Sequence, residues 1–157
     1  MATFKDAKER VWALELDPTV ADEIAAEKGL DLIDPDRLTE VFSKLGMGST
    51  RLLVEVLYML CHEQAEAKQI TPEDFGRAMK PKALQEAFVA LQEAVSDFSQ
   101  SPEIADARRK IFRACNEKMG EAVKELTQEK LRNLLTVRIS GANSGGSLES
   151  PDSTHGG

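Results

Sequence analysis

Histidine and cysteine are scarce in this chain, with two of each among 157 residues. His62 directly follows Cys61, but neighbouring residues on a helix point about 100° apart. No second Cys/His pair stands at the spacing of a zinc site. We therefore expect no metal ion and no cofactor, and a half-exposed His62 on a helix. Cys61 and Cys115 fall on apolar helix faces, which favours small buried residues over a disulfide.

Long apolar runs and an excess of positive charge are also missing. No stretch approaches the roughly 18 apolar residues of a membrane-spanning helix, and the N-terminus has no apolar secretion signal. We therefore expect a cytoplasmic protein without a membrane partner. The net charge of −7 argues against nucleic acid, because phosphate binding requires a basic face. The dense basic cluster of Arg108, Arg109, Lys110 and Arg113 is flanked by acidic residues, which indicates a solvated helix face.

Motifs for catalysis and for ligand binding are few. Gly46-Met47-Gly48 lacks the lysine and the preceding strand of a phosphate-binding loop. Asp31, Asp34 and Asp36 resemble the start of a calcium loop, but Pro35 interrupts it and the later glycine and glutamate are missing. Helix capping by Asp34 explains the same residues. We therefore expect no catalytic residues and no enzyme activity.

What the sequence does contain is a series of helix starts. Four prolines each follow a residue that can cap a helix, and proline suits the first helical turn. These pairs are Asp17-Pro18, Asp34-Pro35, Thr71-Pro72 and Ser101-Pro102. Lys80-Pro81 begins another segment with a weaker cap, while Gly29 and Gly46 are expected to close the first two helices. The predicted helices span residues 18–28, 35–45, 49–67, 72–79, 81–98 and 102–136.

Two short strands are predicted before the helices, at residues 3–5 and 10–16. Trp12, Leu14 and Leu16 alternate onto one face of the second strand. A lone hairpin is marginal in water, so this face should pack on helices. The predicted fold class is mainly α: a helical bundle with a short N-terminal β-hairpin in residues 1–139. Residues 140–157 are rich in serine and glycine and cannot offset the entropy of ordering, which predicts a flexible tail.

The last predicted helix carries an apolar stripe at helical spacing. Its members are Ile104, Ala107, Ile111, Cys115, Met119, Ala122 and Leu126. This helix is longer than a compact small domain needs, so part of its apolar surface is a candidate for contact with a partner. The candidate contact residues are Met119, Leu126, Leu131, Leu134 and Leu135. The alternative, that they complete the core of the monomer, stays open at this point.

The order of apolar anchors between Thr3 and Ser101 resembles a known family. The residues that carry the resemblance are Phe4-Lys5-Asp6, Trp12 with Leu14 and Leu16, Leu30-Asp31-Leu32, Val56 to Cys61 with Gln64-Ala65, Ile70 to Met79, Ala87, Leu91 and Asp97-Phe98. The family consists of small proteins encoded among the tail genes of tailed bacteriophages and prophages, and its members resemble tail assembly chaperones. In that family a Gly-Arg pair usually precedes the tryptophan, where this chain has Glu9-Arg10.

The resemblance implies a function in phage tail morphogenesis. Such chaperones are helical and hold the tape-measure protein before the tail tube polymerises, in the cytoplasm of a bacterial host. The implied partner is the tape-measure protein or another helical tail protein, and self-association is open as well. An alternative is a minor structural component of the tail or of the head–tail connector.

Overall fold

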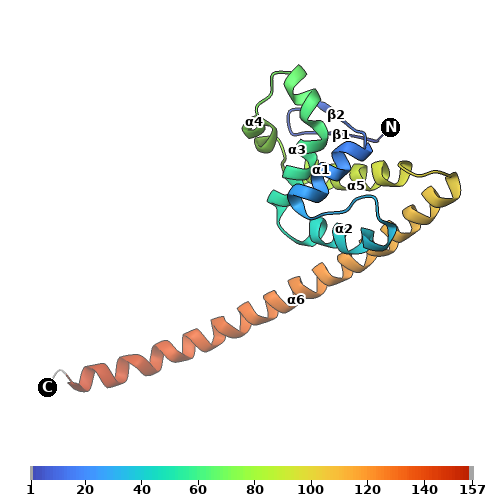
Figure 1. Ribbon diagram of the computed structural model, residues 1–157. Helices are drawn as coiled ribbons and strands as arrows, with labels where there is room; N and C mark the ends of the chain where they lie inside the picture. Colours follow the sequence, from blue (N-terminus) through green and yellow to red (C-terminus); the bar gives the residue numbers. More distant parts are fainter. Residues whose placement is uncertain (1, 156–157) are drawn as a thin grey trace. The chain divides into compact units, whose positions relative to one another are not determined.

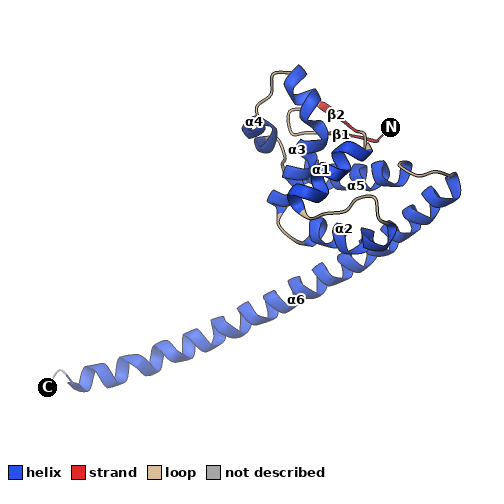
Figure 2. Ribbon diagram, in the orientation of Figure 1, coloured by secondary structure: helices blue, strands red, loops and turns tan. Residues whose placement is uncertain are grey.

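The computed structural model describes the backbone of residues 2–155 and the side chains of residues 2–136. The protein is mainly helical with an N-terminal two-stranded antiparallel hairpin, as predicted (Figure 1, Figure 2). The chain divides into two compact units, Met1–Met119 and Gly120–Gly157, and the boundary between them lies inside the last helix. Among the described residues, no helix combines the length and the apolar content needed to cross a membrane.

The elements follow the predicted order closely. The strands are β1 (Ala2–Lys5) and β2 (Val11–Leu14). The helices are α1 (Pro18–Lys28), the 3-10 turn η1 (Pro35–Arg37), α2 (Leu38–Met47), α3 (Thr50–Ala67), α4 (Pro72–Arg77), α5 (Pro81–Asp97) and α6 (Pro102–His155). The segment predicted as one helix at 35–45 is thus a 3-10 turn that leads into α2.

The hairpin packs on helices through the face that its alternation predicts. Phe4 lies opposite Trp12 in the register of the two strands, and both side chains are buried with Leu14 and Leu16. β1 lies against α5, and β2 lies against α3 (Figure 1). The Gln64 side chain of α3 donates to the Ala13 carbonyl oxygen at 2.7 Å and accepts from the Ala13 amide at 3.0 Å. These two hydrogen bonds satisfy the backbone groups of Ala13 on the edge of β2 that does not face β1, where another strand could otherwise pair.

A buried carboxylate holds the turn between the strands. The Asp6 side chain has no exposed area, and it accepts hydrogen bonds from the backbone amides of Lys8 and Arg10. Its second oxygen accepts from Arg10 Nε at 2.7 Å and from Trp12 Nε1 at 3.0 Å. The turn therefore depends on four donors that converge on one side chain, where the sequence pattern indicated only a polar loop.

Glu9 in this turn has a backbone φ of 61°, a left-handed conformation that residues with a Cβ adopt only at a steric cost. We expect Glu9→Gly to stabilise the protein by about 1 kcal/mol, because glycine adopts this conformation without the steric cost. The measurement is the free energy of unfolding in urea. Glu9→Ala is the matched control, since it removes the same charge but keeps the Cβ. A destabilising effect of the glycine variant relative to the alanine variant would contradict this account of the turn.

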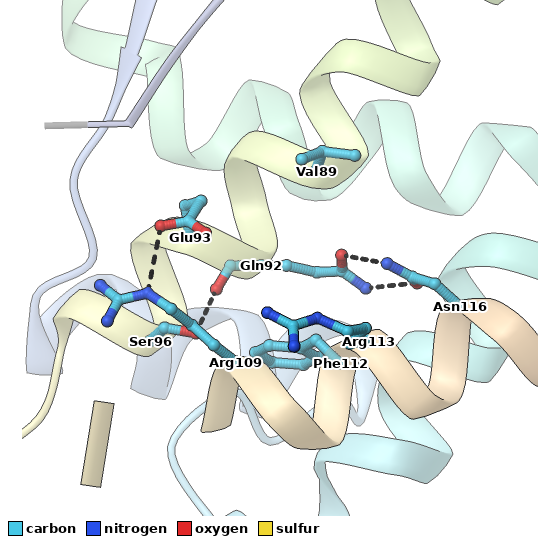
Figure 3. Close-up of a pocket in the computed structure, with 8 residues that line it drawn as sticks. All are labelled: Val89, Gln92, Glu93, Ser96, Arg109, Phe112, Arg113 and Asn116. Atoms are coloured by element: carbon cyan, nitrogen blue, oxygen red, sulfur yellow. Dashed lines mark hydrogen bonds and ion pairs between the residues drawn. The ribbon is translucent and has the colours of Figure 1, made fainter. Parts of the chain in front are cut away.

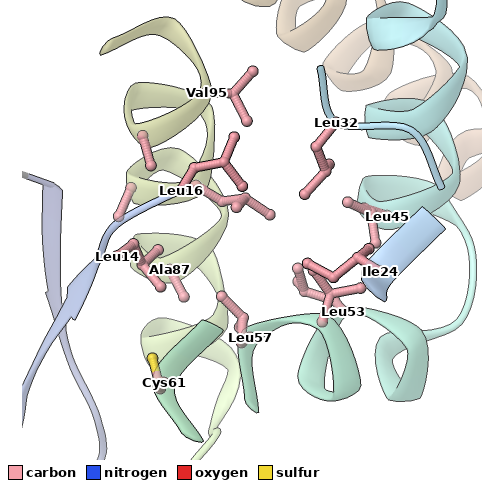
Figure 4. Packing of buried hydrophobic residues seen from close by; sticks show 14 of the residues in the cluster. Leu14, Leu16, Ile24, Leu32, Leu45, Leu53, Leu57, Cys61, Ala87 and Val95 are labelled. Atoms are coloured by element: carbon pink, nitrogen blue, oxygen red, sulfur yellow. The ribbon is translucent and has the colours of Figure 1, made fainter. Parts of the chain in front are cut away.

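The helices of the first unit surround one apolar core (Figure 4). Figure 4 shows Leu57 of α3 and Ile24 of α1 directed toward the same interior as Leu14 from β2. Phe42 of α2 is fully buried, with ring centroids 5.7 Å from Phe88 and 4.6 Å from Phe112 in edge-to-face geometry. Such pairs contribute roughly 0.5–1.5 kcal/mol beyond the burial of their area. Phe112 therefore fastens the first turns of α6 to the core.

The predicted caps are confirmed where a side chain carries them. Asp17, Asp34 and Thr71 accept from backbone amides at the starts of α1, η1 and α4, and Ser101 accepts from the Ile104 amide. Gly29 ends α1 with a φ of 67°. The prediction for Gly46 is wrong, since it lies inside α2 and Gly48 follows the helix end.

Close packing explains the glycine at position 46. A Cβ at this position would lie 2.8 Å from Met119 Sδ and 3.0 Å from Phe88 Cζ, both nearer than side-chain carbons normally approach. Gly46 thus allows the backbone of α2 to lie close to α5 and α6. A glycine near the end of a predicted helix can mark either the helix cap or a place where two helices pack closely. The sequence alone predicts the cap, and the structure shows the close packing.

The apolar stripe predicted on α6 is rotated from the buried face that the structure shows. Ile104, Ala107 and Ile111 are exposed, whereas Cys115 is buried as predicted. The residues that α6 buries against the core are Ala105, Arg108, Phe112 and Cys115. The buried face of α6 differs from the predicted one because the Phe112 ring packs against Phe42 and because Arg108 is buried and not on a solvated face. Its Nη1 donates to the Val95 carbonyl oxygen at 3.0 Å and also to the Phe98 carbonyl oxygen, at the end of α5.

The predicted division at residue 139 falls within α6. Side chains from residue 137 onward lie outside the described residues, as do Gly156 and Gly157 altogether. The flexible tail at 140–157 therefore stays a prediction from composition.

Candidate protein-binding surface

Five large apolar side chains on the second unit are exposed. Their exposed fractions lie between 51% and 66%, and we call this set the α6 face. Its members are Val123, Leu126, Leu131, Leu134 and Leu135. Four of them are candidate contact residues from the sequence, and none belongs to the buried core cluster of the protein. The core cluster consists of other residues, so the α6 face is a candidate surface for contact with another chain.

Val123 is not among the residues predicted from the sequence, although it is as exposed as Leu126. The signal was available, since Val123 lies three positions before Leu126, and residues three apart share a helix face. At 100° per residue the five side chains spread over about half of the helix circumference. Such a broad apolar arc is typical of a helix that packs against another helix.

Met119 is the fifth candidate, and the structure places it differently from the leucines. It is half-buried, and its sulfur lies next to the position that a Cβ on Gly46 would occupy. It belongs to the first unit, where it fills the space that the missing Cβ of Gly46 leaves. Its contribution to the packing of the monomer distinguishes it from the exposed members of the α6 face.

A second surface feature is an open groove of about 220 Å³ between α5 and α6 (Figure 3). Its floor is an amide pair, in which Gln92 Nε2 donates to Asn116 Oδ1 and Asn116 Nδ2 donates to Gln92 Oε1, both at 2.9 Å. The Ser96 hydroxyl donates to the Gln92 carbonyl oxygen at 2.9 Å. The hydrogen bonds between Gln92 and Asn116 therefore link α5 to α6. The residues that line the groove include no nucleophile beside a base.

Arg109 at the edge of this groove forms an ion-pair network across the two helices. It lies 2.8 Å from Asp97 and 3.5 Å from Glu93 on α5, and 3.0 Å from Asp106 on its own helix. Desolvation alone would lower the pKa of Arg109, but the charges of Glu93 and Asp97 and the hydrogen bonds to Glu93 and Asp106 raise it above its ordinary value. The residue is partly exposed, so this network orients α6 on α5 and adds little stability. Arg109 of the predicted basic cluster therefore forms ion pairs within the protein, and Arg108 binds backbone carbonyl oxygens of α5 and its end.

The cysteines and His62 show no sign of reactivity. Cys61 and Cys115 are free and buried, and burial raises the pKa of the Cys61 thiol to about 12, far from the thiolate form that reacts at neutral pH. His62 is half-exposed on α3, as predicted, and its Nε2 lies 3.2 Å from a Glu66 carboxylate oxygen. Among the described residues, no three His, Cys, Asp or Glu side chains are grouped to hold a metal ion.

Comparison of the chain with protein-family models, curated proteins and solved structures found no match.

Proposed function

We propose that this protein is a helix-binding assembly chaperone that acts in phage tail morphogenesis, in the cytoplasm of a bacterial host. In this proposal the α6 face receives an amphipathic helix of a long tail protein, of which the tape-measure protein is the expected example. The protein shields the apolar side of that helix until the tail assembles.

The observation that carries the proposal is the exposure of the α6 face. Each of its side chains leaves half or more of its surface in water, while the core of the first unit is closed without them. Burying one such side chain in a complex contributes roughly 1.5–3 kcal/mol, which gives several of them together the energy of a specific contact. A helix laid into an apolar surface uses anchors at i, i+3, i+4 and i+7. Leu131, Leu134 and Leu135 stand at the first three of these positions, i, i+3 and i+4.

The acidic character of the protein supports the same role. A chaperone that exposes apolar surface needs net charge to stay soluble, and this chain has a net charge of −7. The assignment of the partner as a tail protein rests on the family resemblance of residues 3–101, which lies outside the α6 face.

The test is co-expression with the tape-measure protein of the same phage or prophage. We expect the tape-measure protein to become soluble and to co-purify with this chain. In the variant Leu131→Gln/Leu134→Gln the affinity should fall at least about tenfold, because two apolar anchors are lost while glutamine still favours a helix. The measurement is the dissociation constant for a peptide from the bound tape-measure segment.

Val89→Gln/Ile104→Gln is the matched control, since it removes two exposed apolar side chains of comparable exposure from the first unit. It should leave the affinity unchanged. The proposal fails if the tape-measure protein neither co-purifies nor gains solubility, or if the control weakens binding as much as the α6 variant does.

A further inference from the structure

The apolar residues of α6 between Gly120 and Thr136 form a mirrored pattern. Between Gly120 and Thr136 the apolar residues are Ala122, Val123, Leu126, Leu131, Leu134 and Leu135. They are arranged symmetrically about the point between Gln128 and Glu129. Leu126 and Leu131 are equally far from this point, as are Val123 and Leu134, and Ala122 and Leu135. The five large ones are the exposed side chains of the α6 face.

Such a pattern is what an antiparallel contact between two identical helices requires. In a two-fold interface residue i of one copy meets residue j of the other, and j meets i, so every contact appears twice. If the two-fold axis passes between residues 128 and 129, Val123 of each copy faces Leu134 of the other. Leu126 then faces Leu131. Every apolar residue of the segment thus meets an apolar residue.

The charged residues of the segment are compatible with this antiparallel pairing. Only one mirrored pair has a charge on both members, and these charges are opposite, namely Glu125 and Arg132. Around the axis, Lys130 of one copy faces Thr127 of the other, and Glu129 faces Gln128, so no like charges meet. The half of the segment before the axis has two glutamates and one lysine, and the half after it has one glutamate, one lysine and one arginine. Antiparallel pairing therefore brings an acidic half against a basic half, whereas parallel pairing would align like charges.

We propose that in the absence of a client the α6 face binds the α6 face of a second copy of this chain, as an antiparallel helix pair with its two-fold axis between residues 128 and 129. The pair covers the side chains that a monomer leaves in water. In this dimer the α6 face is covered until a client helix binds it and displaces the second copy. The inference concerns the chain alone and does not require the proposed function to hold.

The experiment is directed cross-linking of the full chain in the absence of any partner. Val123→Cys and Leu134→Cys are made separately, and both positions are exposed, so the monomer should fold normally. Under mild oxidation an equimolar mixture of the two variants should form a disulfide-linked heterodimer. Each variant alone should give much less cross-link. The native cysteines are buried and should contribute none, which wild-type protein checks in parallel.

The orientation of the pair decides between the outcomes. Cross-links of each variant with itself, with no preference for the mixture, would mean parallel pairing and would overturn the proposal. The absence of cross-links in the mixture, together with a mass of 17.3 kDa in sedimentation equilibrium up to high micromolar concentration, would also overturn it. The expected mass for wild-type protein at high concentration is twice this value.

A second variant tests the interface without cysteines. Leu126→Gln/Leu131→Gln changes the two apolar residues nearest to the axis and should raise the dimer dissociation constant at least about tenfold, because the leucines of each copy lose their apolar contacts across the axis. Val89→Gln/Ile104→Gln should leave the dimer intact. An equal loss in both variants would contradict the proposed interface. Since no client is present, failure here leaves the chaperone proposal standing, and failure of client binding leaves the dimer standing.

Discussion

Asp6→Asn is expected to destabilise the protein by about 2–4 kcal/mol, although the two side chains have nearly the same shape. The carboxylate accepts four hydrogen bonds in a fully buried position, two of them from the side chains of Arg10 and Trp12. An asparagine can replace the oxygen that the backbone amides bind, but its second atom is then an NH₂ group. This group would face the donors Arg10 Nε and Trp12 Nε1, which leaves buried donors without acceptors.

The same carboxylate should make the stability of the wild-type protein depend on pH. Burial alone would raise the pKa of Asp6, but the hydrogen bonds from Trp12, Arg10 and the Lys8 amide outweigh this effect and hold the pKa below its ordinary value. The folded protein therefore binds this proton less readily than the unfolded chain. The stabilisation is complete above the unfolded pKa of about 3.9 and is lost as the pH falls through the lower folded pKa.

The measurement is urea unfolding of wild type and Asp6→Asn at a series of pH values from neutral to acidic. The difference in free energy between the two proteins should be largest at neutral pH and should shrink in acid. Asp22→Asn is the control, because Asp22 is an exposed aspartate on α1, and its substitution should change the free energy of unfolding by less than about 0.5 kcal/mol. A constant difference between wild type and Asp6→Asn at all pH values would show that the charge of Asp6 is not what stabilises the turn.

Local signals in the sequence were sufficient for the order of the elements. The capping residues Asp17 and Thr71 act through hydrogen bonds to amides a few positions away, so the chain nearby contains all the information needed. The hairpin face of Trp12 and Leu14 could be predicted for the same reason, because alternation along a strand is a local property.

Features that depend on distant residues could not be predicted in this way. Gly46 is small because of Met119 and Phe88, which are far from it in sequence. Arg108 is buried because the end of α5 offers it two carbonyl oxygens. An arginine beside other basic residues normally indicates a solvated face, and nothing local distinguishes this one.

The candidate site shows the same division. The leucines of the α6 face could be named from their spacing, and their mirrored order is also a property of the sequence. The groove between α5 and α6 could not be predicted, since the pairing of Gln92 with Asn116 depends on how the two helices pack. Polar residues on an amphipathic helix are normally assigned to water, and only the packed structure shows that these two bind each other.

Phe112→Ala is expected to destabilise the protein by about 3–5 kcal/mol, the range for truncating a buried phenylalanine. Phe112 is 4% exposed, and its ring lies 4.6 Å from the ring of Phe42, so its removal leaves a cavity against the aromatic side chain of α2. The groups around this cavity belong to three helices and cannot all move to close it. The first turns of α6 should therefore lose their attachment to the core before the rest of the unit unfolds.

Ile111→Ala is the matched control for this prediction, and it also decides between the two phases of the helix. The apolar stripe read from the sequence directs Ile111 inward, whereas the structure leaves 36% of its surface exposed. We expect its truncation to cost well under half as much as that of Phe112, since a partly exposed side chain loses less buried area and leaves a smaller cavity. Urea unfolding measures both variants. If Ile111→Ala proved the more damaging of the two, α6 would pack with the phase of the predicted stripe, and the buried position of Arg108 would also be wrong.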